Sequence, residues 1–229
     1  SIHSGVKPEI FRAMVKAVVL DKTPSPADTA AALERVRRVR QEILDGADFA
    51  AVASRESSDS VSAAAGGSLG TFAKGMMVPA FDSAVFAAPV GRVGEPLQTA
   101  FGWHVFEVQQ RWAMDSAQAR HILIPIERTD SSEVHLLTLA DSLEEMALSR
   151  SLDEAAATLG LSTTTTELTS TFPFLAGAGQ IGEGADWAME DGAPGDVSPV
   201  FESPQAFYAL ELISAEPAGV LPLAEAGPA

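Results

Sequence analysis

The polar side chains with the chemistry to orient a bound group flank one glycine-rich stretch of the sequence, residues 66–108. Asp59 comes shortly before the paired glycines at 66 and 67, and Thr99 and His104 come near the end of the stretch. Single large apolar residues stand between the glycines: Leu69, Phe72, Met77, Phe81, Phe86 and Phe101. Glycine-punctuated backbone with isolated apolar anchors is typical of a chain bent around a shallow pocket. The spacing therefore predicts backbone bent around a shallow pocket.

The sequence gives little support for thiol, metal or cofactor chemistry. The 229 residues contain no cysteine, which excludes thiol catalysis and disulfide bonds. The four histidines are scattered, so no metal-ligating cluster is expected. No cofactor is expected either.

The glycine-rich stretch resembles a known family. The ordered elements GG-x-LG-x-F, KG-x-MVPAF, VF, VG, EP and T-x-FG-x-H resemble the C-terminal two-thirds of a parvulin-type peptidyl-prolyl cis–trans isomerase. An ordered set of this kind is far more specific than a lone glycine motif. The alternative is an unrelated small α/β domain with a glycine-rich hairpin.

The resemblance implies rotation about an X–Pro amide, whose barrier is roughly 18–20 kcal/mol because its C–N bond has double-bond character. Such a site has to hold the proline ring, exclude water and favour the twisted amide. The resemblance implies that Leu69, Met77 and Phe81 form the proline pocket, with Phe101 as a further wall. Plain core packing is the alternative for Met77 and Phe81.

The resemblance also implies that Asp59, Thr99 and His104 act as the catalytic residues. A carboxylate at Asp59 that faces the amide would disfavour its planar resonance form. The loop from Asp59 to Gly66 is longer than in many relatives, so a second interpretation is that Asp59 only caps a loop.

Family members usually carry two histidines on neighbouring strands, and this sequence departs from that pattern. Ala17 falls where the first histidine of the N-terminal copy belongs. His121 has that position in the second copy, where Phe207 or Tyr208 replaces the other histidine. His104 and His121 are therefore expected to belong to different repeats and not to form a pair, with His121 a structural histidine. The incomplete pair favours the alternative function, a non-catalytic chaperone or interaction module.

The pattern of apolar residues predicts a mixed arrangement of helices and strands in the first half. The expected elements are a strand at 14–20, a helix capped by Ser25 and ending at Gly46, a short helix after Asp48, a polar loop at 54–65, a helix at 79–87, two strands, and a junction at 111–116. The second half restarts this order after about 105 residues, which indicates tandem duplication. Its expected elements are a strand at 119–124, a helix capped by Ser131 with Val134, Leu137, Leu143 and Met146 on its apolar faces, a helix with a capping box at Ser151 and Glu154, and strands at 162–169 and 206–212.

The prediction is therefore an α+β protein of two tandem parvulin-like (FKBP-like) domains, each a small antiparallel sheet surrounded by helices. Residues 1–114 would be the isomerase domain and residues 115–229 a degenerate, acidic copy. The charge follows this division: residues 1–114 contain 12 basic and 12 acidic residues, whereas residues 115–229 contain 3 and 19.

Composition and resemblance together suggest the partners. The acidic half would repel nucleic acid and anionic lipid, and it could attract basic or unfolded chains; a purely solvating acidic surface is the alternative. No apolar run approaches the ~18 residues of a membrane span. The resemblance implies unfolded or proline-containing polypeptides as clients, and a periplasmic or otherwise extracytoplasmic location.

Overall fold

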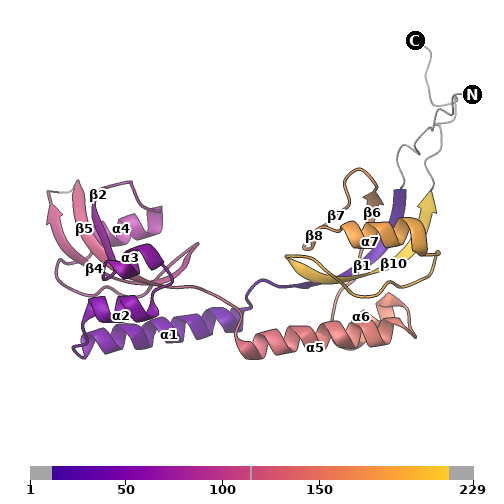
Figure 1. Cartoon of the computed structure of the whole chain (residues 1–229), viewed down its shortest axis with the longest axis horizontal. Helices are drawn as coiled ribbons and strands as arrows, with labels where there is room; N and C mark the ends of the chain where they lie inside the picture. The colour runs from indigo at the N-terminus through magenta and orange to yellow at the C-terminus, as the bar shows by residue number, and fades with distance from the viewer. Residues whose placement is uncertain (1–11, 114, 217–229) are drawn as a thin grey trace, which may run out of the picture. The chain divides into compact units, whose positions relative to one another are not determined.

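The computed structural model describes residues 12–113 and 115–216, which fold into two compact units. Residues 24–132 form one unit, called here the histidine unit, and the described residues 12–23 and 133–216 form the other, the acidic unit. Each unit contains a four-stranded sheet covered by helices (Figure 1). The α+β class predicted from the sequence is confirmed.

The histidine unit is an antiparallel sheet with four helices. Its helices are α1 (Pro26–Leu44), α2 (Phe49–Glu56), α3 (Ser60–Ala64) and α4 (Pro79–Ala87). Its strands are β2 (Ser68–Ala73), β3 (Leu97–Thr99), β4 (Gly102–Trp112) and β5 (Ser116–Ile124), in the spatial order β2-β5-β4-β3. The helices at 26–44, 49–56 and 79–87 match the sequence-based expectations, whereas α3 lies in the segment that was expected to be a loop.

Strand β4 separates two apolar clusters, because successive side chains of a strand point to opposite faces of the sheet. Val105 packs against α1 and α2, in a cluster with Val36, Val39, Phe49 and Val52. Phe106 and Val108 pack on the other face, in a cluster with Phe72 and with Phe81, Val85 and Phe86 of α4. Helix α4 therefore lies on the face to which His104 also points.

The two ends of the histidine unit are tied together at Asp28. Ser25 caps α1 and forms a capping box with Asp28, as the sequence predicts. The buried Asp28 carboxylate also accepts hydrogen bonds from the backbone and hydroxyl of Thr129 and from the hydroxyl of Ser132. The backbone bond from Thr129 and the bonds from Ser25 and Ser132 hold the pKa of Asp28 well below its usual range. A single carboxylate thus joins the start of α1 to the segment after β5.

The acidic unit has a second four-stranded sheet. Its elements are β1 (Arg12–Asp21), α5 (Asp130–Ala147, whose first turn belongs to the histidine unit), α6 (Leu152–Leu159), β6 (Thr164–Thr169), β7 (Phe174–Leu175), β8 (Gly179–Gln180), α7 (Gly182–Asp186), a π-helical turn η1 (Trp187–Asp191), β9 (Phe201–Glu202) and β10 (Ala206–Glu216). The spatial order of the sheet is β6-β1-β10-β9, and β7 pairs with β8.

In the acidic unit, α6 matches its sequence-based expectation, whereas α5 differs from it. The capping box of Ser151 and Glu154 begins α6, and Gly160 ends it in the left-handed conformation, as expected. Ser131, the expected cap, lies inside the helix, which begins at Asp130. The buried residues of this helix are Leu136, Ala140 and Leu143, whereas Val134 and Leu137 are exposed. The buried stripe is thus rotated from the expected one.

The main correction concerns β1 and β5, which have exchanged places relative to the sequence repeats. Strand β1, expected to open the first domain, pairs with β10 and β6 in the acidic unit. Strand β5, expected to open the second domain, lies between β2 and β4 in the histidine unit. The expected domains 1–114 and 115–229 therefore have the wrong boundaries.

The reason for the exchange lies in the segment at 111–116, which was expected to be a junction. Arg111 and Trp112 still belong to β4, and Trp112 pairs directly with Ser116 of β5. A hairpin between adjacent segments closes a short loop and so costs little entropy. Strand β5 thus pairs with the strand that precedes it in sequence, and this leaves β1 for the other sheet.

Candidate functional site

A pocket of about 380 Å³ opens on the α4 face of the histidine unit. Its lining is Asp59, Leu69, Met77, Val78, Phe81, Phe101, His104, His121 and Leu123. Six of the seven residues singled out from the sequence are in this lining. The seventh, Thr99, contacts His104 by a hydrogen bond. The residues come from the helices, the strands and the loops between them, so the site exists only in the folded unit.

His104 and His121 lie side by side, which contradicts the expectation that they belong to different domains. The two rings are stacked, with centroids 5.3 Å apart and planes at 23°. Their Nδ1 atoms are 3.1 Å apart. The pair forms because β5 lies next to β4, where His121 is opposite Phe106 and His104 is opposite Leu123. Ala17, in β1, is part of the acidic unit and cannot stand in this site.

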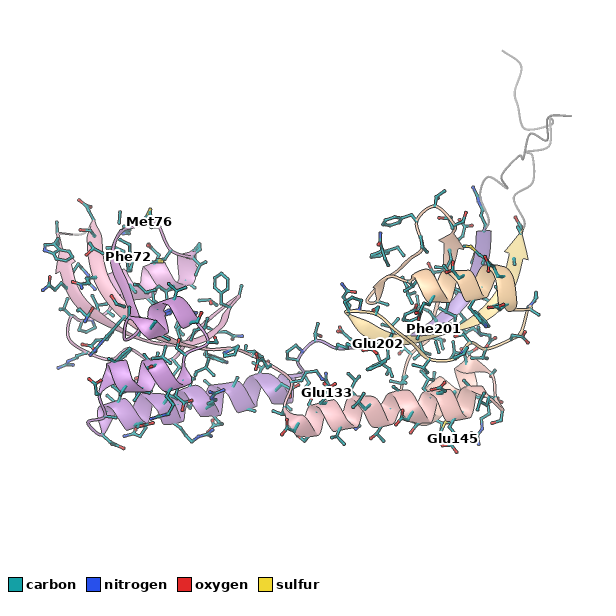
Figure 2. All side chains as sticks on the ribbon, viewed as in Figure 1. Phe72, Met76, Glu133, Glu145, Phe201 and Glu202 are labelled. Atoms are coloured by element: carbon teal, nitrogen blue, oxygen red, sulfur yellow. The ribbon has the colours of Figure 1, made fainter. Side chains whose placement is uncertain are left out.

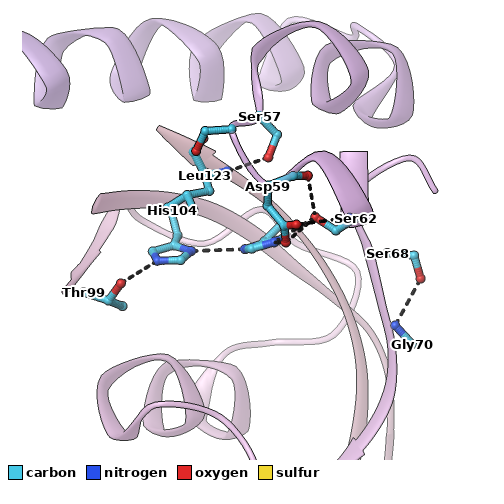
Figure 3. A network of polar contacts seen from close by, with 10 residues as sticks. Ser57, Asp59, Ser62, Ser68, Gly70, Thr99, His104 and Leu123 are labelled. Carbon is cyan, nitrogen blue, oxygen red and sulfur yellow. Dashed lines mark hydrogen bonds and ion pairs between the residues drawn. The ribbon is translucent and has the colours of Figure 1, made fainter. Parts of the chain in front are cut away.

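A continuous chain of hydrogen bonds runs through the pair (Figure 3). Thr99 Oγ1 lies 2.7 Å from His104 Nε2, and His121 Nε2 lies 2.9 Å from Asp59 Oδ2. The backbone N–H of Phe101 donates to Thr99 Oγ1 at 3.1 Å. Four side chains, one from a loop and three from strands β3, β4 and β5, are therefore held in one fixed order.

Asp59, at one end of this chain of hydrogen bonds, limits which atoms can donate. An ionised Asp59 can only accept, so His121 Nε2 carries a proton and donates it. When His104 donates from Nδ1 to His121 Nδ1, its Nε2 accepts from the Thr99 hydroxyl. Each ring nitrogen of the two imidazoles thus already has a partner.

The pKa shifts of His104 and Asp59 agree with these hydrogen-bond roles. Burial, and after it the neighbouring His121, lower the pKa of His104 to about 4. Burial by itself would raise the pKa of Asp59, but hydrogen bonds from Ser62 and His121 outweigh it and leave the pKa below its ordinary value. At neutral pH Asp59 is therefore charged and His104 is neutral.

Asp59 caps a helix and also contacts the histidine pair. It is the N-cap of α3, where it accepts hydrogen bonds from the backbone and hydroxyl of Ser62. Its Oδ2 also pairs with His121. The segment after Asp59 is therefore not an open loop, because it contains the short helix that Asp59 caps.

The apolar wall of the pocket is partly made of core residues. Phe81 is only 3% exposed, and its ring lies 5.2 Å from that of His104, 5.8 Å from that of His121 and 5.7 Å from that of Phe106. Phe81 is therefore both a pocket residue and a core residue. Leu69 and Met77 are half-buried at the edge of the same cluster, and Phe101 is 62% exposed at the rim.

Gly67 shows why the glycine pair precedes the pocket. Its φ is +85°, and its carbonyl accepts a hydrogen bond from the backbone N–H of His121 at 2.8 Å. A Cβ at this position would lie 2.5 Å from the His121 carbonyl oxygen. Only glycine lets the loop approach β5 so closely, and this contact holds the backbone of His121 in place.

Sequence reasoning missed three lining residues: Val78, Leu123 and His121. The signal for His121 was present, because the strand at 119–124 was identified as similar to a parvulin opening strand. It was assigned to the second repeat on sequence order alone. Among the described residues no group of three or more His, Cys, Asp or Glu could hold a metal ion.

Comparisons with known proteins give a family match over part of the chain. Residues 14–110 match the family model "Rotamase: PPIC-type PPIASE domain". The chaperone SurA of Saccharophagus degradans is 34% identical over 129 residues, 54% of this chain and 30% of that protein. The chaperone SurA of Hahella chejuensis is 37% identical over 127 residues, 53% and 29% of the two chains. The chain thus spans less than a third of these relatives' length.

Similar solved structures include the peptidylprolyl isomerase PrsA from Bacillus anthracis, with a TM-score of 0.30 and 19% identity, covering 66% of this chain and 61% of that one. The parvulin domain of PpiD from E. coli has a TM-score of 0.25 and 19% identity, covering 52% and 92%. No helix among the described residues is long and apolar enough to cross a membrane. The match identifies residues 14–110 as a PPIC-type (parvulin) peptidyl-prolyl isomerase domain within this chain.

Proposed function

We propose that the histidine unit catalyses cis–trans isomerisation of X–Pro bonds in unfolded or partly folded polypeptides. One observation carries the proposal: an apolar pocket has, as its polar wall, the hydrogen-bonded series Thr99, His104, His121 and Asp59. This arrangement supplies both a place for a proline ring and a fixed polar surface beside the rotating amide.

The proline ring would lie against Leu69, Met77 and Phe81. Rotation of the amide needs neither a nucleophile nor a cofactor, because no bond other than the partial C–N double bond changes. An apolar wall removes water from the carbonyl and so weakens the charge-separated planar form relative to the twisted one. Each tenfold acceleration requires only ~1.4 kcal/mol of preference for the twisted amide.

The polar residues would then act through charge and position. Every imidazole nitrogen of the pair already has a hydrogen-bond partner, so proton transfer to the substrate is not part of the proposal. Asp59, ionised at neutral pH, would disfavour the planar form by placing negative charge near the amide. His104 and Thr99 would hold the floor of the pocket.

The same proposal covers clients and location. Relatives named as chaperones support polypeptide clients, and the family resemblance supports an extracytoplasmic location. Residues 24–132 contain 10 basic and 13 acidic side chains, whereas the rest of the chain contains 5 and 18. The strongly acidic unit would repel nucleic acid and anionic lipid.

A non-catalytic chaperone is the second candidate. Its support from the sequence was the incomplete histidine pair, and that argument fails because the pair is complete. A different observation favours it: Phe172 and Phe174 of the acidic unit are both exposed and stack with ring centroids 5.7 Å apart. Exposed aromatic pairs are suited to holding unfolded chain without catalysis.

The test is a protease-coupled assay of a prolyl peptide with the full chain and two matched variants. Met77 lines the pocket, whereas the neighbouring Met76 does not line it and is 72% exposed (Figure 2). We expect Met77→Ala to lower kcat/KM about tenfold or more, and Met76→Ala to change it less than twofold.

Circular dichroism checks that both variants stay folded. Equal losses in the two variants would contradict the pocket assignment. A wild-type chain that fails to accelerate isomerisation, but suppresses aggregation of an unfolded protein, would favour the chaperone instead.

A further inference from the structure

A second groove, of about 530 Å³, lies on the other face of the histidine unit's sheet. Along β4 the side chains alternate, so Trp103 and Val105 face α1 while His104 and Phe106 face α4. Leu33, Arg37 and Arg40 of α1 form one side of the groove, and Pro96 and Trp103 form the other. The groove is therefore separated from the proline pocket by the thickness of the sheet.

Two arginines and one carboxylate, that of Glu95, line this groove in an acidic protein. The formal net charge of the chain is −16, yet four of its 15 basic residues lie between positions 35 and 40 of α1. Arg37 and Arg40, spaced by three residues, lie on one side of the helix together with Leu33. Guanidinium groups gathered at one place on an otherwise acidic protein are suited to bind a partner that carries carboxylates.

Each arginine pairs with a glutamate whose side chain is exposed. Arg37 pairs with Glu34, and both side chains are largely exposed. Arg40 donates through Nε to the carbonyl of Gly94 at 2.8 Å, which fixes its position, and through its terminal nitrogen to Glu95. The Glu95 side chain is 82% exposed. Exposed ion pairs of this kind contribute little stability, so another carboxylate can replace either glutamate.

The wall opposite α1 is apolar and holds a donor without a partner. The Nε1 of Trp103 is buried and has no hydrogen-bond partner among the described residues. Buried donors without partners are rare in folded proteins. Pro96 directly precedes β3, which is an edge strand of its sheet. The combination of guanidinium groups, an indole, a proline and a sheet edge fits an extended peptide better than a small inorganic anion.

We propose that this groove binds a polypeptide segment in which an acidic residue adjoins an apolar one. The carboxylate takes the place of Glu95 or Glu34 at the two arginines, and the apolar side chain lies against Leu33, Pro96 and Trp103. Binding here does not require proline and is independent of the histidine pair. The histidine unit then has two peptide sites, one on each face of its sheet.

The test uses the full chain and a capped, proline-free peptide of alternating glutamate and phenylalanine, with a lysine-for-glutamate peptide as the matched ligand. Fluorescence anisotropy of the labelled peptides gives the affinities. We expect the double variant Arg37→Gln/Arg40→Gln to bind the acidic peptide at least tenfold more weakly. Arg38→Gln is the control, since Arg38 is exposed on the same helix and does not line the groove.

A residue-specific readout does not depend on any variant that could misfold. The chain contains three tryptophans, Trp103, Trp112 and Trp187, so its indole region has three N–H resonances in a ¹⁵N-correlated spectrum. The acidic peptide should shift the Trp103 resonance and leave the other two in place.

Four results would overturn the proposal. One is an equal loss of affinity in Arg38→Gln, which would mean general charge attraction. The others are equal binding of the lysine peptide, displacement by a proline-containing peptide bound in the histidine pocket, and an unshifted Trp103 resonance at saturation.

Discussion

The two units repeat one plan around exchanged central strands, and the pocket of the histidine unit aligns with a buried tyrosine in the acidic unit. The backbone N–H of Gly91 donates to Val108 at 2.8 Å in the histidine unit, and that of Gly195 donates to Leu212 at 2.7 Å in the acidic unit. Cross-strand ion pairs also correspond: Arg120 with Glu107, and Lys16 with Glu211. These shared contacts align the two sheets residue by residue.

In this alignment Tyr208 takes the place of His104, since each lies four residues before the aligned pair Val108 and Leu212. Ala17 takes the place of His121, because Ala17 is opposite Leu210 as His121 is opposite Phe106. The strand exchange therefore collects both histidines in one unit and both replacements in the other.

The replacements close the second site. Tyr208 is fully buried, and its hydroxyl lies 3.2 Å from the backbone nitrogen of Gly184, within hydrogen-bond distance. A Cβ on Gly184 would lie 2.6 Å from the Tyr208 ring, so α7 packs directly onto the tyrosine. Phe201, labelled in Figure 2, lies against the same ring at 5.6 Å. Residues that open a pocket in one unit thus have core-filling counterparts in the other.

The largest expected effect comes from cutting the chain at the two alternative boundaries. Residues 24–132 form a contiguous segment with β5 in its sheet and both ends tied at Asp28, so this fragment should fold and bind prolyl peptides. Residues 1–114 lack β5 and therefore lack His121. We expect this fragment to lose the isomerase activity, measured by the same prolyl-peptide assay.

One variant sharpens this comparison. If β1 moves into the vacant position in fragment 1–114, Ala17 stands where His121 was, and Ala17→His should then restore activity to that fragment. Equal activity in the unmodified fragments 1–114 and 24–132 would show that the strand exchange has no bearing on the site.

A smaller difference is expected in how the two units respond to acid. The folded histidine unit keeps His104 neutral with a pKa of about 4, whereas an unfolded chain binds a proton there near the ordinary value of about 6.5. Stability from this group is therefore complete above pH ~6.5 and is lost as pH falls towards 4. The loss is on the order of 3 kcal/mol at pH 4, because each pKa unit corresponds to ~1.4 kcal/mol.

Urea unfolding of the full chain between pH 7 and pH 4 measures this loss. The histidine unit should become much less stable over this range, and the variant His104→Gln should remove most of the dependence. Tyr208 does not titrate between these pH values, so the acidic unit should lack this particular response. An unchanged slope in His104→Gln would place the sensitivity elsewhere.

The smallest expected effect is the change in kcat/KM when a single histidine is removed from or added to the full chain. His121→Ala breaks the link between His104 and Asp59, and we expect kcat/KM to fall about tenfold, equivalent to ~1.4 kcal/mol. Ala17→His should change kcat/KM less than twofold, because Ala17 lies in the other unit. A rise in activity in Ala17→His would contradict the exchanged arrangement.

Much of this protein follows from local sequence. Capping residues set the starts of α1 and α6, since a side chain that bonds the first free N–H groups acts only within its own turn. Proline at position 79 and the flanking turns set α4. These features involve neighbours along the chain, so the sequence by itself determines them. The family resemblance of the glycine-rich stretch named six residues that line the pocket, although they meet only in the folded unit.

The tertiary structure alone decided which sheet each central strand joins, and with it the histidine pair. Strands β1 and β5 both alternate buried and partly exposed residues, so either pattern suits either sheet. The short turn between Trp112 and Ser116 favours the pairing of β5 with β4, and that choice brings His121 to His104. Strand pairing depends on contacts between distant segments, which the apolar pattern of one strand does not specify.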